Sequence, residues 1–254
     1  MSDLLTVEEM SAGYDGNTVV RNIGLSVEAG ELVTLAGPNG AGKTTILSCI
    51  SGLTPVTSGS VQLSGRSLVG LAPHRIAAAG VAHVPEGRSL FRSLSVRENL
   101  VVPGRRGSAR RSLDTAIGLF PELEPLLDRR AGLLSGGEQQ MLAISRAMVV
   151  SPKVLIVDEM SLGLAPIVVQ RLIRVLRDAA DTGDVGVLVV EQHIPLILPK
   201  ADRAYILVHG ELVFDGPASR LQDDPAIVAA TYLGDGAAEP GGGGPSGASS
   251  QNCE

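Results

Sequence analysis

The stretch LVTLAGPNGAGKTT, residues 32–45, decides the fold of this 254-residue chain. Its first five residues form a continuous apolar run, which is typical of a strand buried on both faces of a parallel sheet. Residues 37–44, GPNGAGKT, fit the pattern G-x-x-x-x-G-K-[ST], and the sequence TTILSCI then indicates a helix. A strand, a glycine-rich turn and a helix in this order predict a phosphate-binding loop, and a chance glycine turn is the weaker alternative.

The residue types of this loop match the chemistry of phosphate binding. Glycines let backbone N–H groups converge on phosphate oxygens, and the helix N-terminus adds a positive dipole. Lys43 is placed to neutralise the β- and γ-phosphates, and Thr44 is placed to offer a hydroxyl group to Mg²⁺. We therefore expect a nucleotide to be bound by Gly37, Asn39, Gly40, Ala41, Gly42, Lys43, Thr44 and Thr45.

A second apolar run, KVLIVDE at residues 153–159, ends in two acidic residues. Ligands of open α/β sheets bind beyond the carboxyl ends of the strands. Asp158 is therefore expected to organise Mg²⁺, and Glu159 to activate a water molecule as a general base. The alternative is that the two acidic residues simply begin an exposed loop. The phosphate loop favours the functional interpretation, because nucleotide chemistry at such a loop requires carboxylates nearby.

The rest of the chain predicts an α/β protein. A third buried run, VGVLVVE at residues 185–191, follows a helical stretch from 166 to about 181, which completes a βαβ unit. The N-terminal segments LLTVEEM and TVVRNIGLSV mix polar and apolar residues, so they predict an antiparallel β arm.

Between about residues 90 and 134 no convincing strand is found. Ser95 and Glu98 have capping-box spacing, and the following segments SARRSLDTAIGLF and PELEPLLDRR read as helical. We therefore predict one domain over residues 1–235 with a helical insertion at about 90–150, and a disordered Gly/Pro/Ser-rich tail over residues 236–254.

Composition excludes several classes of protein. The net charge is −6, and the chain has six aromatic residues and no Trp, so it has neither a positive field nor many stacking platforms for nucleic acid. The acidic N-terminus is unlike a secretory signal, and charge and Pro interrupt the longest apolar stretches before they reach the length of a membrane span. Two cysteines give no disulfide framework, which suits the cytoplasm.

The segment LSGGEQQ, residues 134–140, precedes a strongly helical sequence. Ser135 and Glu138 form a second capping-box pattern, so one interpretation is simply a well-capped helix. The other is a second anion site, because Gly136 and Gly137 expose backbone N–H groups beside the helix N-terminus.

GPNGAGKT, LSGGEQQ and VLIVDE, in this order and spacing, resemble the nucleotide-binding subunits of ATP-binding cassette (ABC) transporters, and the resemblance covers residues 1 to about 234. It implies a P-loop ABC cassette with a mostly parallel core sheet that hydrolyses ATP with Mg²⁺. It also implies a head-to-tail dimer, in which ATP on the phosphate loop of one subunit is covered by Ser135, Gly136 and Gly137 of the other.

The strings PEGR (85–88), SLGLAP (161–166), VVEQH (189–193) and YLG (232–234) narrow the resemblance to the F-type ATPase of Liv-type branched-chain amino-acid importers. This implies membrane permease subunits, a second ABC ATPase and, indirectly, a solute-binding protein as partners. The chain would then lie on the cytoplasmic face of the membrane. The alternatives are an ABC ATPase of an exporter or lipid-handling complex, and an ABC ATPase outside transport.

The resemblance also assigns single residues. Tyr14 matches the aromatic residue that stacks on adenine, although an ordinary strand-end Tyr is the plain alternative. Glu86 takes the place of a Gln that senses Mg²⁺ and the permease. Phe91 follows in the region that receives a permease helix, where an anchor in a groove and core packing are equally expected.

Three positions depart from the broad family. Gln192 stands where a His usually contacts the γ-phosphate, and we assign it that role in preference to the neighbouring His193. Ala165 replaces an Asp of the dimer loop, and Met160 replaces a Pro. Because Gln carries no charge, these departures leave nucleotide binding in place and argue against strong independent hydrolysis at this subunit's own site.

Overall fold

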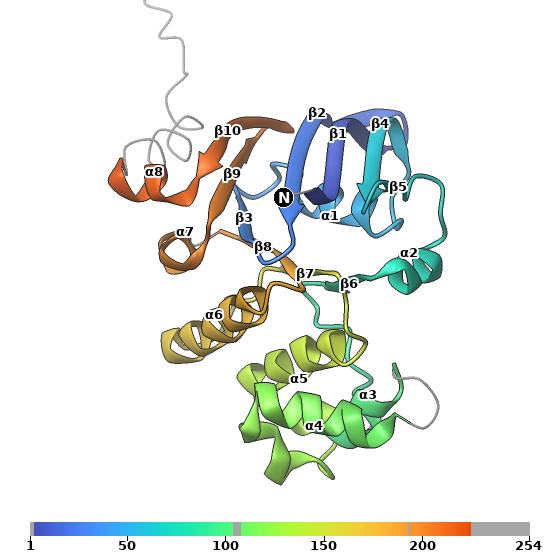
Figure 1. Ribbon diagram of the computed structural model, residues 1–254, viewed down its shortest axis with the longest axis vertical. Helices are drawn as coiled ribbons and strands as arrows, with labels where there is room; N and C mark the ends of the chain where they lie inside the picture. The colour runs from blue at the N-terminus through green and yellow to red at the C-terminus, as the bar shows by residue number, and fades with distance from the viewer. Residues whose placement is uncertain (1–2, 104–107, 193, 225–254) are drawn as a thin grey trace, which may run out of the picture.

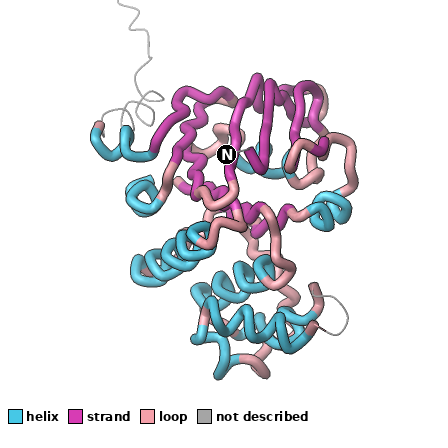
Figure 2. Tube along the Cα trace, in the orientation of Figure 1, coloured by secondary structure: helices cyan, strands magenta, loops and turns pink. Residues whose placement is uncertain are grey.

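The computed structural model describes residues 3–103, 108–192 and 194–224 and divides into two lobes (Figure 1). One lobe contains the β-sheets, and the other contains helices from the middle of the chain. Figure 2 shows the same division, with the strands gathered in the upper part and only helices and loops in the lower part. The predicted arrangement of a β-rich body with a helical insertion is therefore confirmed.

The core sheet has six strands in the order β10-β9-β3-β8-β7-β6, and only β10 runs antiparallel to its neighbour. The three predicted runs contain β3, β7 and β8, and every residue of these strands is buried. The strands are β3 (Leu32–Ala36), β6 (Val81–Val84), β7 (Val154–Asp158), β8 (Gly186–Glu191), β9 (Arg203–Val208) and β10 (Glu211–Pro217).

Alternate residues of β7 face two different cores. Val154 and Ile156 belong to a core shared with α1 (Lys43–Ile50), whereas Leu155 and Val157 belong to a core shared with α6 (Pro166–Asp181). Side chains of a strand alternate between the two faces, so a strand covered on both faces needs apolar residues at every position. This explains why continuous apolar runs predicted the sheet.

The antiparallel arm is a second sheet in the order β2-β1-β4-β5. The sequence predicted β1 and β2, and the structure adds two strands that pair beside them. Their bounds are β1 (Asp3–Tyr14), β2 (Asn17–Glu28), β4 (Val56–Leu63) and β5 (Arg66–Ser67). The core that contains α1 also takes side chains from β1 and β2, so the arm packs over the helix that follows the phosphate loop.

The helical lobe begins and ends at capped helices. The Ser95 side chain accepts from Glu98 N at 3.1 Å, and Ser135 caps α5 with Glu138 in the same way, so both predicted capping boxes are confirmed. Of the segment PELEPLLDRR, residues Pro121–Leu126 form a 3₁₀-helix, with Pro125 inside it. The lobe contains α3 (Val96–Val101), α4 (Ala109–Leu119), α5 (Gly136–Met148) and a short 3₁₀-helix at Ala131–Leu133.

The remaining helices are α2 (Pro73–Ala79), α7 (Ile194–Ile197), the 3₁₀-helix Leu198–Lys200 and α8 (Ala218–Asp223). None of the described helices combines the length and the apolar character that crossing a lipid bilayer requires. The predicted tail and the YLG string lie outside the described residues.

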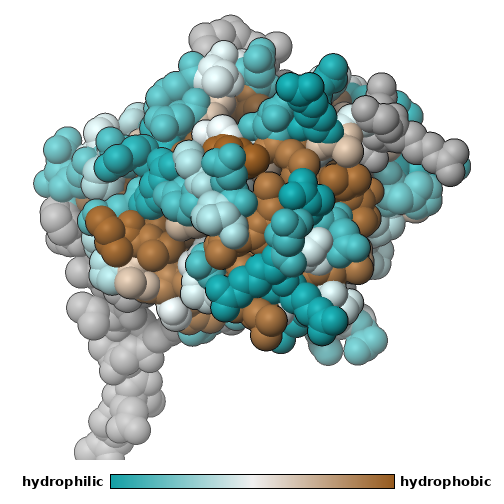
Figure 3. Space-filling model, turned by 90° about the horizontal axis from the view of Figure 1, so that it is seen from below, coloured by the Kyte–Doolittle hydropathy of each residue, from teal (hydrophilic) through white to brown (hydrophobic). Residues whose placement is uncertain are grey.

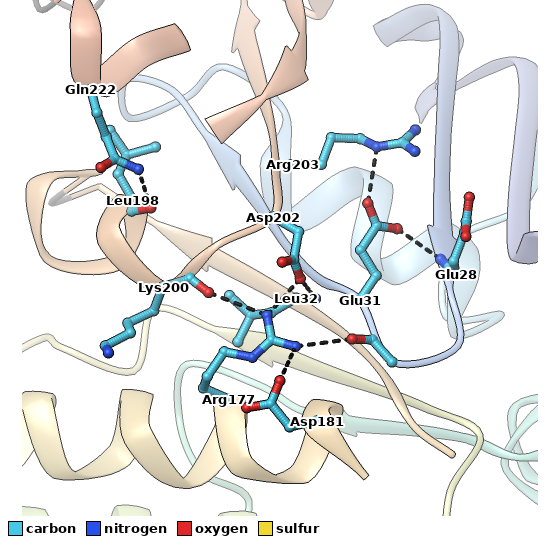
Figure 4. Close-up of polar contacts among 11 residues, drawn as sticks. Glu28, Glu31, Leu32, Arg177, Asp181, Leu198, Lys200, Asp202, Arg203 and Gln222 are labelled. Atoms are coloured by element: carbon cyan, nitrogen blue, oxygen red, sulfur yellow. Dashed lines mark hydrogen bonds and ion pairs between the residues drawn. The ribbon is translucent and has the colours of Figure 1, made fainter. Parts of the chain in front are cut away.

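Arg177 ties together three segments at the amino ends of the core strands (Figure 4). It donates to the Gly30 carbonyl oxygen at 2.9 Å and forms ion pairs with Asp181 and Asp202. Asp202 also accepts from the backbone N–H of Leu32, the first residue of β3, at 2.8 Å. This cluster therefore joins α6, the turn before β3 and the segment before β9 at the edge of the sheet opposite the phosphate loop.

Candidate functional site

The loop 37–42 connects β3 to α1 at the carboxyl edge of the core sheet. Gly37, Gly40 and Gly42 have φ angles of 153°, 78° and 108°, which other residues rarely adopt. A Cβ atom on Gly37 would lie 2.1 Å from the Leu207 carbonyl oxygen, so a side chain is excluded there. Gly42 is the N-cap of α1 and offers no side-chain acceptor, which leaves the first N–H groups of the helix available to an anion.

Lys43 reaches back over the loop that precedes it. Its Nζ donates to the carbonyl oxygens of Gly37 at 2.8 Å and Pro38 at 2.9 Å. Burial lowers the pKa of Lys43, while the charges of Glu159 and Asp158 act in the opposite direction. The ammonium group thus contacts the loop and lies within the electrostatic influence of both predicted carboxylates.

Asp158, the last residue of β7, is a buried carboxylate beside α1. Its Oδ2 accepts a hydrogen bond from the Thr44 hydroxyl at 3.3 Å. Burial, with the nearby charges of Glu159 and Glu86, raises the pKa of Asp158 to about 6, against the Thr44 hydrogen bond and the Lys43 charge. The structure therefore places the Thr44 hydroxyl group against Asp158, with the charge of Glu86 acting on the same carboxyl, and the roles of these residues toward Mg²⁺ stay predictions.

The residues around Asp158 fit a divalent cation. Asp158 Oδ1 is buried and has no hydrogen-bond partner within the part of the chain that the structure describes. An unpaired buried carboxylate oxygen is costly, and a cation would satisfy it. Because no group of three His, Cys, Asp or Glu residues with metal-site geometry occurs in the described ranges, a Mg²⁺ ion held here would need oxygen ligands from elsewhere.

Glu159 follows at a strained backbone position with φ of 45°. Its N–H donates to the Val190 carbonyl oxygen at 2.9 Å, and its Oε1 accepts from Gln192 Nε2 at 2.7 Å. A pocket of about 240 Å³ opens beside this pair, and Ser161, Leu162, Gly163 and Glu191 complete its lining. The geometry therefore supports Glu159 and Gln192 as neighbours in one site, whereas His193 lies outside the described residues.

Glu191 is a site residue that sequence reasoning missed. It ends β8, is only 2% exposed, and accepts from Ser161 N at 2.9 Å and Ser161 Oγ at 2.7 Å. It thus ties the segment after Glu159 to the segment that carries Gln192. Its position after an apolar run, like that of Asp158, was the available signal.

Tyr14 lies at the end of β1, which contacts α1. Its ring is 48% exposed, and its hydroxyl group is 3.2 Å from the hydroxyl oxygen of Thr54, just beyond α1. An exposed ring beside the helix of the phosphate loop leaves a face open for stacking, and its role toward adenine stays a prediction.

Ser135, Gly136 and Gly137 lie in the other lobe. They open α5, whereas the phosphate loop opens α1, and Figure 1 shows these two helices in different lobes. Both glycines pack closely, because added Cβ atoms would lie 3.2 Å from Leu164 and 3.0 Å from Val168. The structure therefore does not bring the two predicted anion sites of one chain together.

Phe91 is not a core residue. Its ring is 47% exposed, and the guanidinium carbon of Arg146 lies 5.1 Å from the ring centroid. The helical lobe also exposes Val102 and Leu133. Figure 3 shows, on the face seen from below, apolar patches separated by hydrophilic side chains. Of the two sequence-based expectations for Phe91, the structure rules out core packing.

The family model of the ABC transporter matches residues 20–161 of the chain. BraG of Pseudomonas aeruginosa, a high-affinity branched-chain amino acid transport ATP-binding protein, is 40% identical over 91% of this chain and 100% of its own length. LptB of Escherichia coli K12, a lipopolysaccharide export system ATP-binding protein, is 36% identical over 91% and 97%. The ADP conformation of MJ1267, an ATP-binding cassette of an ABC transporter, matches with a TM-score of 0.77 at 23% identity, covering 90% of this chain and 98% of that one.

Proposed function

Because this chain belongs to the ABC transporter family, we propose that it binds and hydrolyses ATP to power a membrane importer of branched-chain or related amino acids. The observation that carries the proposal is the shared edge of the sheet, where Lys43, Asp158, Glu159 and Gln192 meet beyond β3, β7 and β8. The chain is 40% identical to BraG over the full length of that protein, which supports branched-chain amino acids as the class of transported solute.

Within this subunit, the proposed hydrolysis uses groups at the carboxyl edge of the core sheet. Phosphate oxygens replace the carbonyl oxygens of Gly37 and Pro38 as partners of Lys43, and the N–H groups of the loop and of α1 bind the same anion. Thr44 and Asp158 would hold Mg²⁺, which would supply charge neutralisation at the phosphates. Glu159 accepts a proton from the attacking water. Gln192, which the resemblance assigns to the γ-phosphate, also donates an amide N–H to the Glu159 carboxylate and so orients it.

A dimer completes the site. Ser135, Gly136 and Gly137 lie in a different lobe from the phosphate loop of their own chain, which favours a role on the ATP of a second subunit. The exposed Phe91 ring with Arg146 above it offers an apolar and cationic surface to a permease helix. We place the chain on the cytoplasmic face of the membrane through this contact, with a solute-binding protein as an indirect partner.

An exporter is the second candidate, and the 36% identity with LptB is the observation that favours it. The identity with BraG is higher, at 40%, and the PEGR, SLGLAP and VEQ strings resemble the importer subfamily. We therefore rank import first.

The test is the Glu159→Gln variant in the complex that co-purifies with this chain. We expect ATP binding to persist and phosphate release to fall at least about 100-fold, because the water loses its proton acceptor. Glu211→Gln, on the exposed start of β10, is the matched control and should hydrolyse ATP normally. Undiminished phosphate release by the Glu159→Gln complex would refute the role of Glu159 as general base. The isolated wild-type chain should hydrolyse ATP more slowly than the wild-type complex does.

A further inference from the structure

The loop 85–89, PEGRS, follows β6 and carries Glu86, whose charge acts on Asp158. Its backbone is strained at two consecutive positions, since φ is 61° at Arg88 and 45° at Ser89. Residues other than glycine rarely adopt this conformation, and it persists only where the surroundings hold it. Within the loop, the Arg88 and Ser89 N–H groups donate to the Pro85 and Gly87 carbonyl oxygens at 2.8 and 2.7 Å, and contacts with α5 add to these bonds.

The guanidinium groups of two arginines form hydrogen bonds between this loop and α5. Arg88 donates through Nε to Gln140 Oε1 at 2.9 Å and through Nη1 to Gln139 Oε1 at 3.2 Å. From the other direction, Arg146 of α5 donates to the Ser89 carbonyl oxygen at 2.8 Å. The loop is thus fastened to the first and last turns of one helix.

Among the described residues, Arg88 is the side chain that donates a hydrogen bond to the buried amide group of Gln140. Gln140 is 2% exposed, and its Nε2 lacks a hydrogen-bond partner among the residues described. Without Arg88, both ends of this buried amide would be unpaired, which is an unfavourable state. The Arg88 guanidinium also lies beside the start of α5, because a Cβ atom on Gly136 would be 3.6 Å from Nη2.

We propose that Arg88 is a positioning residue that makes the first turn of α5 move with the loop of the metal site. The inference rests on the proposed function, in which Glu86 and Asp158 serve the chain's own ATP and the start of α5 serves the ATP of a second subunit. Arg88 would then connect the two ATP sites of a dimer through one side chain.

The test measures ATPase activity of the co-purified complex with Arg88→Met in this chain. We expect kcat to fall about 5-fold or more, the range of a typical coupling between sites. Affinity for a fluorescent ATP analogue, measured on the isolated chain, should stay unchanged, because Arg88 lies outside the ATP-binding residues. Arg75→Met, an exposed arginine of α2, is the control and should leave both quantities unchanged.

A rescue experiment separates positioning from general stability. Arg88→Lys loses the fork that spans two amides and should lower kcat, whereas Arg88→Lys with Gln140→Glu should recover it, because an ammonium–carboxylate pair replaces the lost contact. A complex with Arg88→Met that hydrolyses ATP at the wild-type rate, or a double variant that recovers nothing, would overturn the inference. An inactive wild-type complex would instead count against the proposed function.

Discussion

Ionisation of the Asp158 carboxyl group is unfavourable in the nucleotide-free protein, because the group is buried. Burial raises the pKa of this carboxyl to about 6, and one of its oxygens lacks a hydrogen-bond partner in the described chain. The folded protein therefore binds this proton more tightly than the unfolded chain does. The associated stability is present below about pH 4 and is lost as pH rises through about 6.

The first prediction concerns Asp158→Asn in nucleotide-free protein. At pH 7.5 we expect the variant to have a free energy of unfolding about 1 to 3 kcal/mol higher than that of the wild type, because the substitution removes an ionised buried group. Its melting temperature should rise accordingly. The gain should disappear near pH 4.5, where wild-type Asp158 is protonated, and Mg²⁺-dependent hydrolysis should be lost.

Thermal melts across this pH range provide the measurement. Asp178→Asn, an exposed position on α6, is the control and should gain nothing at either pH. A gain for Asp158→Asn that is the same at both pH values would contradict the assigned burial of the charge.

The second prediction concerns Tyr14. Tyr14→Ala should weaken ATP binding by about 1 to 3 kcal/mol, which is the usual contribution of a base stacked on an aromatic ring. The ring is 48% exposed, so the melting temperature should change little. Tyr14→Phe keeps the ring and loses only the Thr54 contact, so it should bind ATP as wild type does. Equal affinities of the Ala and Phe variants in a titration would reject the stacking role.

At the residue scale, the sequence could indicate candidate site residues where the residues lie within one short segment, and their roles stay predictions. Lys43, Thr44 and Asp158 follow from a loop pattern and an apolar run, because their chemistry depends on local spacing. Glu191 and Arg88 were missed, because their partners Ser161 and Gln140 lie 30 and 52 residues away in sequence. Only the register of the sheet and the packing of the loop on α5 reveal them.

At the scale of elements, the strands that are apolar on both faces were the most predictable. β3, β7 and β8 are buried at every position, so the continuous apolar runs in the sequence indicated them. β10 alternates between exposed and half-buried residues and is an antiparallel neighbour of β9. Its signal was too weak to separate it from loop sequence, and the same holds for the two-residue strand β5.

The third prediction concerns the Arg177 cluster, which connects three segments at the amino ends of the strands. Arg177→Met leaves Asp202 and the Gly30 carbonyl oxygen without this donor, so we expect a loss of about 2 kcal/mol of unfolding free energy. ATP affinity should be unchanged, because the cluster lies at the opposite edge of the sheet from the phosphate loop.

Arg110→Met is the matched control for this variant. Its side chain is 95% exposed and pairs with Asp114 at 3.9 Å, so its removal should cost less than about 0.5 kcal/mol. Denaturant titrations of both variants measure the difference, and equal losses would show that the cluster contributes nothing beyond a surface ion pair.

At the scale of the whole molecule, the two predicted groups of ATP-binding residues lie in different lobes. The phosphate loop and the carboxylates lie on the β-rich lobe, and Ser135 opens a helix of the other lobe. A sequence pattern cannot show this separation, because the motifs are ordered along the chain without their distances in space. The resemblance to a family anticipated it, and the arrangement of α1 and α5 supports it.

The scarcity of aromatic residues also acquires a meaning at this scale. Aliphatic side chains build nearly all of the core, and Tyr205 and Phe120 are the largest fully buried side chains among the residues that the structure describes. Tyr14 and Phe91 are about half exposed, so one third of the six rings lie at surfaces with a proposed partner, ATP or a permease.

ATP-dependent uptake of labelled leucine into proteoliposomes tests the central claim most directly. The vesicles contain the complex that co-purifies with this chain, with its solute-binding protein outside and ATP inside. We predict uptake with wild-type chain and none with Glu159→Gln, while the Glu211→Gln complex transports normally. Wild-type vesicles that hydrolyse ATP without accumulating leucine, isoleucine or valine, or that take up leucine equally well with Glu159→Gln, would contradict the account.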